Sequence, residues 1–166
     1  MLRTTYAAPV FIDTRFDPPR RQRVAAYAVI CRGEADAREV LLSRLAPYLS
    51  VEERWTLPGG GIAFGEHPRE AVVREVFEET GLHAEIGTRA WTDSATRVLR
   101  QERLEMQSVR MVFEGRVPED SPEPRVVEID GSTVDARWHR VVDVRSGRVV
   151  TVPMVTEALA QFTPWE

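Results

Sequence analysis

The stretch from Pro68 to Gly81, PREAVVREVFEETG, constrains the fold more than any other part of the sequence. Proline suits the first turn of a helix, and glycine suits the position just after the last turn. The sequence therefore predicts one helix with both ends marked. On this helix one face is predicted to point toward the core, and it carries Val73, Val76, Phe77 and Thr80.

Three glutamates, Glu75, Glu78 and Glu79, lie on the other side of the same helix. Spacings of three and four residues place them on one face, where like charges cost a few tenths of a kcal/mol per pair. They also lie near the helix C-terminus, where the helix dipole disfavours negative charge. This arrangement of charges therefore does not stabilise an isolated helix.

Ion pairs within the helix are one explanation, because Arg74 can pair with Glu70 and Glu78 at a spacing of four residues. Arginine neutralises only part of the face, however. The helix also follows GGGIAFGE, a glycine-rich turn whose backbone can approach a ligand closely. Hard divalent cations favour several carboxylate oxygens together with a backbone carbonyl, and Mg²⁺ is often completed by substrate phosphates. The pattern therefore favours a cation site over a solvated helix face.

The segment Gly60–Leu82, GGIAFGEHPREAVVREVFEETGL, resembles the Nudix box of Nudix hydrolases at every defined position. The resemblance implies an α/β fold, an α/β/α sandwich with a mixed β-sheet. It also implies hydrolysis of a nucleoside diphosphate linked to another group, with Mg²⁺ or Mn²⁺ as the cofactor. The matching positions are Gly60, Glu66, Arg74, Glu75, Val76, Glu78, Glu79, Gly81 and Leu82.

Carried over by position, the resemblance implies a role for each polar residue of the box. Glu75, Glu78 and Glu79 are the expected metal ligands, together with the carbonyl of Gly59 or Gly60. The expected catalytic set is Glu75, Glu78, Arg74 and Glu66. Within it, Arg74 is expected to hold Glu78 in position, and Glu66 to support the site.

The general base is left open by the sequence. Glu75 is one candidate, and an acid in a later loop is another. Glu123, Glu128 and Asp130 lie in the loop region before DARWHR, and Glu128 and Asp130 are the preferred second acids. The alternative is that this loop is simply a solvated acidic segment.

The substrate is less constrained than the reaction. Nothing after the box matches the family's markers for ADP-ribose, diadenosine polyphosphate or NADH, and LLSR at 41–44 resembles only the first part of the coenzyme A element that lies upstream of the box. This leaves a (deoxy)nucleoside di- or triphosphate, with nucleotide sugars open. A nucleotide-binding sensor without turnover is the alternative function. Arg97, Arg100 and Arg103 form a basic run. The candidate substrate-binding residues are Arg44, Arg54, Trp91 and Arg110.

The whole chain sets the remaining expectations. Its 166 residues suit one domain, predicted over residues 23–166 after an N-terminal arm at residues 1–22. A net charge of −4 gives no global basic field, so neither nucleic acid nor a membrane is an expected partner. The resemblance implies a small nucleotide as the partner, and a homodimer is left open. The single cysteine, Cys31, and the lack of an apolar leader favour a cytoplasmic location.

Alternation and turn signals predict the remaining elements. Extended segments are expected at 24–32, 39–45, 83–87, 90–99, 107–117 and 135–141, with a short strand running into the glycine turn at 55–61. A terminal amphipathic helix is expected at 151–162.

Overall fold

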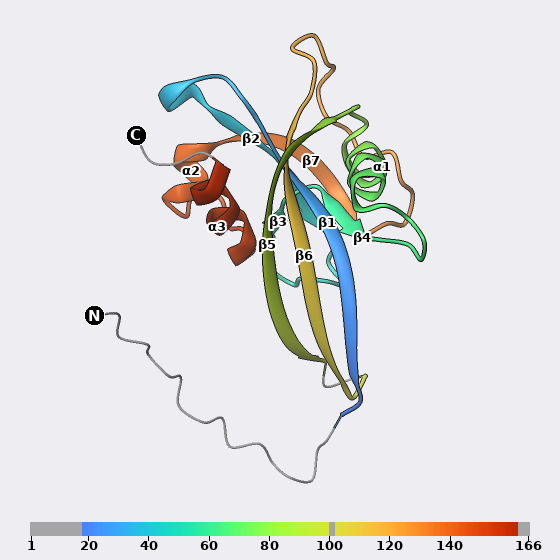
Figure 1. The fold of residues 1–166 in the computed structure, drawn as a ribbon. Helices are drawn as coiled ribbons and strands as arrows, with labels where there is room; N and C mark the ends of the chain where they lie inside the picture. The colour runs from blue at the N-terminus through green and yellow to red at the C-terminus, as the bar shows by residue number, and fades with distance from the viewer. Residues whose placement is uncertain (1–17, 100–101, 163–166) are drawn as a thin grey trace, which may run out of the picture.

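The computed structural model describes residues 18–99 and 102–162, and it contains one sheet of seven strands with helices on both faces (Figure 1). The strands are β1 Arg20–Arg32, β2 Glu39–Leu45, β3 Trp55–Thr56, β4 Gly59–Gly61, β5 Glu85–Leu99, β6 Leu104–Arg116 and β7 Thr133–Arg140. The helices are the short 3₁₀ turn η1 Ala35–Ala37, and α1 Pro68–Thr80, α2 Val141–Arg145 and α3 Pro153–Phe162.

The sheet is mixed, and β1 is its central strand. The order is β3-β2-β1-β6-β5, with β4 paired to β1 and β7 paired to β2. β1 runs parallel to β6 over its length from Arg20 to Ile30, whereas β5 and β6 form an antiparallel pair. β4 lies antiparallel against residues 25–27 of β1, so the glycine turn of the box is part of the sheet itself.

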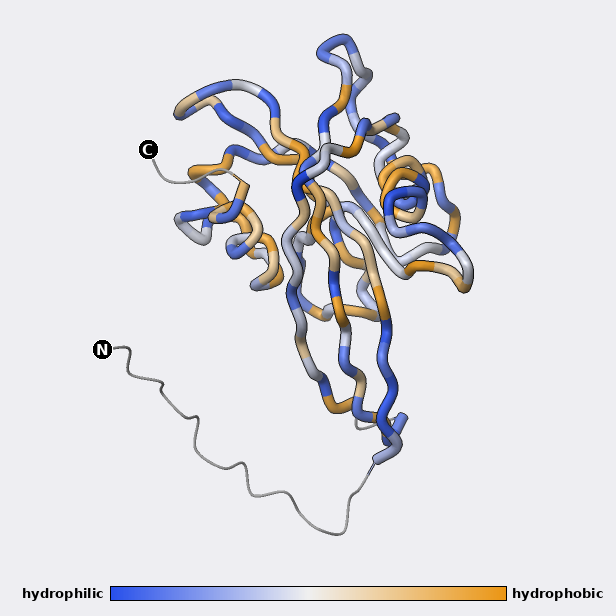
Figure 2. The backbone as a smooth tube through the Cα atoms, viewed as in Figure 1, coloured by the Kyte–Doolittle hydropathy of each residue, from blue (hydrophilic) through white to orange (hydrophobic). Residues whose placement is uncertain are grey.

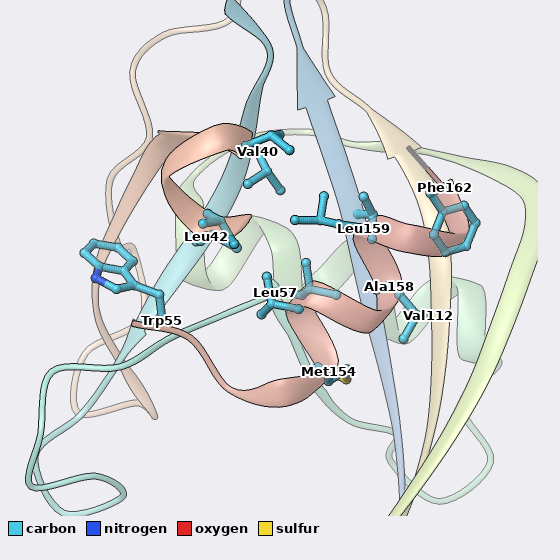
Figure 3. Packing of buried hydrophobic residues seen from close by; sticks show 13 residues of the cluster. Val40, Leu42, Trp55, Leu57, Val112, Met154, Ala158, Leu159 and Phe162 are labelled. Carbon is cyan, nitrogen blue, oxygen red and sulfur yellow. The ribbon is translucent and has the colours of Figure 1, made fainter. Parts of the chain in front are cut away.

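Two apolar clusters cover the two faces of the sheet. One lies toward α2 and α3 and includes Val29, Leu42, Leu57, Met154 and Leu159, as Figure 3 shows. The other lies toward α1 and contains Ala28, Ile30, Leu41, Val72 and Phe113. Alternate residues of β1 therefore serve opposite cores, which is the pleat expected of a strand buried on both faces. The predicted α/β/α sandwich is confirmed.

Helix α1 begins and ends where the sequence predicts. The ring of His67 accepts a hydrogen bond from the backbone N–H of Arg69 at 3.2 Å, and Pro68 occupies the first turn. Gly81 has φ 69° and donates to the carbonyl of Phe77. Its left-handed conformation is one that glycine adopts without a steric cost.

The predicted core face of α1 is wrong at two positions. Val73 and Phe77 are each 37% exposed, whereas Ala71, Val72 and Val76 are buried. The helix is turned so that Glu79 and Thr80 also point inward, because buried donors are available there for the Glu79 carboxylate. Phe77 instead stacks on His83 at the surface, with ring centroids 4.7 Å apart.

Other element bounds also differ from the prediction. β5 is one continuous strand, because a register shift between Ile86 and Ala90 carries it past the glycine that suggested a break. β1 begins at Arg20, so the end of the predicted arm belongs to the sheet, while residues 1–17 lie outside the described residues. The short helix α2 had no signal in the sequence. No helix in the described ranges is long and apolar enough to cross a membrane.

Candidate active site

The glycine strand β4 brings its backbone against two glutamates of α1. A Cβ atom at Gly60 would lie within 2.5 Å of Cδ of Glu75, so the absence of a side chain is what admits this carboxylate. One residue earlier, the N–H of Gly59 donates to Glu79 Oε2 at 3.0 Å. Strand β4 and helix α1 are thus joined through carboxylates rather than through apolar contacts.

Glu79 is the most buried acid of the box, with 2% of its surface exposed. Its other oxygen, Oε1, accepts a hydrogen bond from Thr133 Oγ1 at 2.6 Å, and Ser132 Oγ lies at 3.4 Å. Burial raises the pKa of Glu79 to about 7, although the bonds from Thr133 and Gly59 act in the opposite direction. The negative charge of Glu79 is therefore only partly compensated by the protein.

Arg74 connects three further glutamates of the box, Glu66, Glu75 and Glu78. Its guanidinium donates to Glu66 through Nε at 2.8 Å and through Nη2 at 3.1 Å. Nη1 donates to Glu75 at 2.8 Å and to Glu78 at 2.9 Å, and Nη2 also reaches the carbonyl of Gly61 at 3.2 Å. Only a planar fork with several donors makes all these contacts, which explains why the position is arginine rather than lysine.

Glu66 anchors this network from the loop. It receives the two bonds from Arg74 and a third from the backbone N–H of Ala63 at 2.8 Å. These hydrogen bonds lower the pKa of Glu66 to about 2. Glu66 is therefore a fixed negative charge that holds Arg74.

Glu75 differs from Glu66 in its electrostatics. Burial raises its pKa, and the bond from Arg74 only partly reverses this. Glu128, from the loop before β7, adds a further charge that raises it. Glu75 and Glu79 are both carboxylates that a nearby cation would stabilise, and their oxygens are the ligands that hard divalent cations prefer.

In the conformation described, the acids of the box bond to the protein. Within residues 18–99 and 102–162, no three acidic, histidine or cysteine side chains are grouped as a ready metal site. Arg74 instead binds Glu75 and Glu78, and Gly59 and Thr133 bind Glu79. The donor set still fits a hard divalent cation, because Glu75, Glu79 and the glycine backbone meet at β4 and supply oxygen only.

Of the loop acids, the structure brings Glu128 to the site. The backbone N–H groups of Val127 and Glu128 both donate to the carbonyl of Glu78 at 2.9 Å, which fastens the loop to the end of α1. Glu123 instead pairs with Arg32 at 3.5 Å. Asp130 lies in a left-handed conformation, with φ 60°.

The four predicted substrate residues separate into two groups. Arg44 pairs with Glu53 at 3.5 Å, and Arg54 pairs with Glu52 at 3.0 Å, so both are engaged beside β3. Val112 of β6 belongs to the apolar cluster toward α2 and α3. Trp91 pairs with Val112, and Arg110 lies two residues before Val112 on the same strand. Trp91 and Arg110 therefore lie on the sheet face toward α3. Arg100 of the basic run lies outside the described residues.

Three residues near the box, Tyr27, Arg23 and Thr133, were missed by sequence reasoning. Tyr27 shares a row with Val112 and Trp91, and charges on Arg23, Glu79 and Glu75 act on it. Arg23 lies beside the glycine turn, where a Cβ at Gly61 would be 3.4 Å from its Nη2. For Tyr27 and Arg23, the alternation of the sequence around β1 predicts a strand. It does not tell which face of that strand lies next to the box. Thr133 had no local signal at all.

Comparison with known proteins agrees with this architecture. The chain is 39% identical over 75 residues to diphosphoinositol polyphosphate phosphohydrolase 3-beta of Bos taurus, a match covering 45% of this chain and 43% of that protein. The chain spans less than half the length of the curated relatives it matches.

Solved structures share the fold over a larger part of the chain. A NUDIX hydrolase of Nitrosomonas europaea matches with a TM-score of 0.61 and 24% identity, over 86% of this chain and 88% of the other. An Ap4A hydrolase of C. elegans, solved as a binary complex, matches with a TM-score of 0.63 and 18% identity, over 85% and 95%. The family model described as NUDIX domain matches residues 21–165. The resemblance seen in residues 60–82 is therefore confirmed, and the chain belongs to the NUDIX family.

Proposed function

We propose that the protein hydrolyses a pyrophosphate bond in a nucleoside diphosphate linked to another group, with a (deoxy)nucleoside di- or triphosphate as the substrate. The observation that carries this proposal is the bonding of Arg74, which holds Glu66, Glu75 and Glu78 in one network beside the glycine strand. A nucleotide sensor has no need of such a network, whereas a hydrolase needs its carboxylates held in fixed positions relative to the substrate.

Mg²⁺ or Mn²⁺ is the proposed cofactor. Glu75, Glu78 and Glu79 would hold it, together with the carbonyl of Gly59 or Gly60. The support is the all-oxygen donor set and the raised pKa values of Glu75 and Glu79, because burial disfavours the charge of both carboxylates and Arg74 offsets this only in part for Glu75. When bound, such an ion offsets phosphate charge and lowers the pKa of a coordinated water.

The remaining box residues act through these carboxylates. Arg74 orients Glu75 and Glu78, and Glu66 fixes Arg74 from the loop side. Glu75 and Glu128 are the proposed candidates for the base that takes the proton from the attacking water. Glu128 is better supported than Asp130 because its charge acts on Glu75.

The substrate is proposed to lie on the sheet face that carries Tyr27, Trp91 and Arg110. Trp91 offers an aromatic surface for a base, and Tyr27 lies in the same row next to the box. Two of the similar proteins are named for anhydride-containing phosphate compounds, diphosphoinositol polyphosphate and Ap4A. These names support a phosphoanhydride as the bond that is cleaved.

The test is a hydrolysis panel with purified protein and Mg²⁺ or Mn²⁺ at alkaline pH. The panel contains nucleoside di- and triphosphates, nucleotide sugars, dinucleotides and coenzyme A. Glu78→Gln is expected to lower kcat by at least ~10², because it removes the charge of a proposed ligand to the ion that offsets the phosphate charge. The matched control is Glu70→Gln, an exposed glutamate in the first turn of the same helix, which should retain turnover.

Two results would contradict the proposal. Near-normal turnover in Glu78→Gln would remove this face from catalysis. Nucleotide binding by thermal shift, with no turnover of any compound by the wild-type protein, would instead favour the sensor function.

A further inference from the structure

The outermost long strand of the sheet, β5, has one edge without a partner. It ends the order β3-β2-β1-β6-β5, and β6 is the one described strand that pairs with it. Figure 1 shows the lower half of β5 running beyond the helices on the outside of β6. Within residues 18–99 and 102–162, only β6 bonds to the backbone of residues 91–99, WTDSATRVL. Alternate residues of this segment, which we call the open edge, therefore keep an N–H and a carbonyl for another strand.

The open edge lacks several features that usually protect an unpaired strand. Proteins blunt such edges with prolines, lysines, β-bulges or short strands. The open edge contains neither proline nor lysine, and it pairs with β6 without a register shift up to Leu99. Thr92, Thr96 and Val98 are β-branched residues that favour strands, and Val98 is 48% exposed. Figure 2 shows the hydrophobic colour at the lower end of β5. The segment is therefore well suited to a further strand partner.

The other edge of the same three strands is protected. Residues 20–24 of β1 pair with β6 on one side and with no described strand on the other. This segment carries Arg21 and Arg23, which are exposed and form no ion pair with any described residue. Pro18 and Pro19 precede it, and proline cannot donate to a ladder. Like charges and prolines thus oppose pairing at β1, which leaves β5 as the edge open to a partner.

The two charged residues of the open edge are matched differently within the chain. Asp93 pairs with Arg110 of β6. Arg97 is exposed, lies opposite Met106, and forms no ion pair with any residue in the described part of the chain. Asp93 and Arg97 are four residues apart, so they lie on the same face of the strand. A carboxylate has two acceptor oxygens, so Asp93 can accept from a second arginine besides Arg110.

One antiparallel register of the open edge with a second copy of itself matches both charges. When Ala95 faces Ala95 of the second copy, Asp93 of each copy faces Arg97 of the other, and Trp91 faces Leu99. Moving the centre by two residues places Asp93 opposite Asp93 or Arg97 opposite Arg97, which is destabilising. Moving it by one residue leaves both charges opposite uncharged side chains. On the other face the favoured register pairs Thr92 with Val98 and Ser94 with Thr96.

We propose that two copies of this chain pair through the open edge, β5 against β5, about a two-fold axis at Ala95. The long strands then form one continuous sheet in the order β1-β6-β5-β5-β6-β1. Such a contact uses the same surface of both copies, so it closes at a dimer. It also places Leu99 of the second copy opposite Trp91, beside the proposed substrate face. The pairing itself does not depend on the proposed function, and its test requires no activity.

Sedimentation velocity of the full chain over the micromolar range tests the pairing, and a monomer–dimer equilibrium is expected. Arg97→Glu turns both symmetry-related charge pairs from attraction to repulsion, so the dissociation constant of the dimer should rise at least ~10-fold. The matched control is Arg21→Glu, the same change of charge at an exposed position on the protected edge. It should leave the dissociation constant unchanged, and circular dichroism checks that each variant is folded.

A disulfide tests where the axis lies. In a Cys31→Ala background, Ala95→Cys brings two cysteines opposite each other, with Cα atoms about 4.5–5.5 Å apart. This separation lies within the range that a disulfide bridges, so mild oxidation should give a covalent dimer. The control is Thr92→Cys in the same background, because Thr92 is exposed on the same strand but faces Val98 of the second copy. It should stay monomeric under denaturing, non-reducing conditions.

Three results would overturn the inference. The first is a monomer at every concentration. The second is a dimer that Arg97→Glu weakens no more than Arg21→Glu does, because the interface then lies elsewhere. The third is a lack of cross-linking by Ala95→Cys, or cross-linking by Thr92→Cys to the same extent. If Arg97→Glu does not fold, the two cysteine variants decide the question.

Discussion

The carboxylate of Glu75 occupies the space where any residue other than glycine at position 60 would place its Cβ. Helix α1 and strand β4 are therefore fitted to each other at the box, and the fit depends on the missing side chain. The neighbouring glycines meet different atoms. A Cβ at Gly59 would overlap the backbone of Ala26 and Tyr27, and one at Gly61 would meet only the end of the Arg23 side chain.

Gly60→Ala is expected to displace the Glu75 carboxylate while the fold remains, because the clash is with a side-chain end rather than with backbone. We expect kcat to fall at least ~10-fold, since small misplacements of positioned groups are costly. Steady-state kinetics measures the fall in kcat, and thermal unfolding measures whether the fold remains.

Two neighbouring glycines are the comparisons. Gly61→Ala should retain Mg²⁺ binding, whereas Gly59→Ala, with φ 143° and a backbone clash, should lower the melting temperature. Unchanged kcat in Gly60→Ala would show that Glu75 does not need its position.

Arg74→Lys keeps the positive charge but removes the fork that contacts Glu66, Glu75 and Glu78. Metal affinity or activity is expected to fall by about 10–100-fold, the usual effect of losing a residue that orients metal ligands. Isothermal titration with Mn²⁺ measures the affinity directly. Arg69→Lys is the comparison on the same helix, because Arg69 bonds to the carbonyls of Ile86 and Gly87 instead of the box acids. Equal effects of both changes would mean that charge alone is required.

Thr133→Val removes the hydroxyl that donates to buried Glu79 at 2.6 Å. In metal-free protein the loss is expected to cost about 1–3 kcal/mol when Glu79 is charged, because a buried acceptor loses its partner. The folded pKa of Glu79, about 7, lies above the ordinary value of 4.5, so the charged form destabilises the fold as pH rises through this window. Removing a bond to the charged form raises that pKa further. Thr133→Val should therefore be more destabilising at pH 8 than at pH 5.5.

Urea unfolding of the wild-type and Thr133→Val proteins at pH 5.5 and pH 8 gives the free energy of unfolding of each protein. The contributions of other titrating groups are the same in both proteins, so they cancel when the two are compared. Thr92→Val, an exposed position on β5, is the control for the change in β-propensity. A cost for Thr133→Val that is the same at pH 5.5 and pH 8 would show that Glu79 does not titrate in this range.

The sequence predicted the box, the ends of α1 and the layered fold because their signals are local. Proline, glycine and the glutamate spacing all lie within residues 60–82. The inward turn of Glu79 could not be predicted, because it depends on Thr133, which lies 54 residues away on β7. The same is true of the exposed positions of Val73 and Phe77, which follow from that turn.

Only some residues of the proposed substrate face were candidates from the sequence. Trp91 and Arg110 were candidates by residue type, yet only the register of β5 and β6 with β1 places them in line with Tyr27. Arg21 belongs to the stretch that suggested an arm, and Arg23 follows that stretch directly, since prolines and charges are typical of solvated segments. Parallel pairing with β6 makes that stretch part of the sheet, and parallel partners that are distant in sequence leave no local pattern.

The parallel pairing of β1 with β6 also bears on the order in which the molecule folds. Partners such as Arg20 and Glu105 are 85 residues apart, so closing this pair costs more chain entropy than forming the local β5–β6 hairpin. Strand β4 pairs with β1, so it needs β1 to be in position first. Thr133 can donate to Glu79 only once β7 has paired with β2. The acidic face of α1 is consequently completed late, when most of the chain has left the ribosome. During synthesis Arg74 can pair with Glu75 and Glu78 as soon as the helix forms, whereas Glu79 gains its partners only when β4 and β7 have joined the sheet.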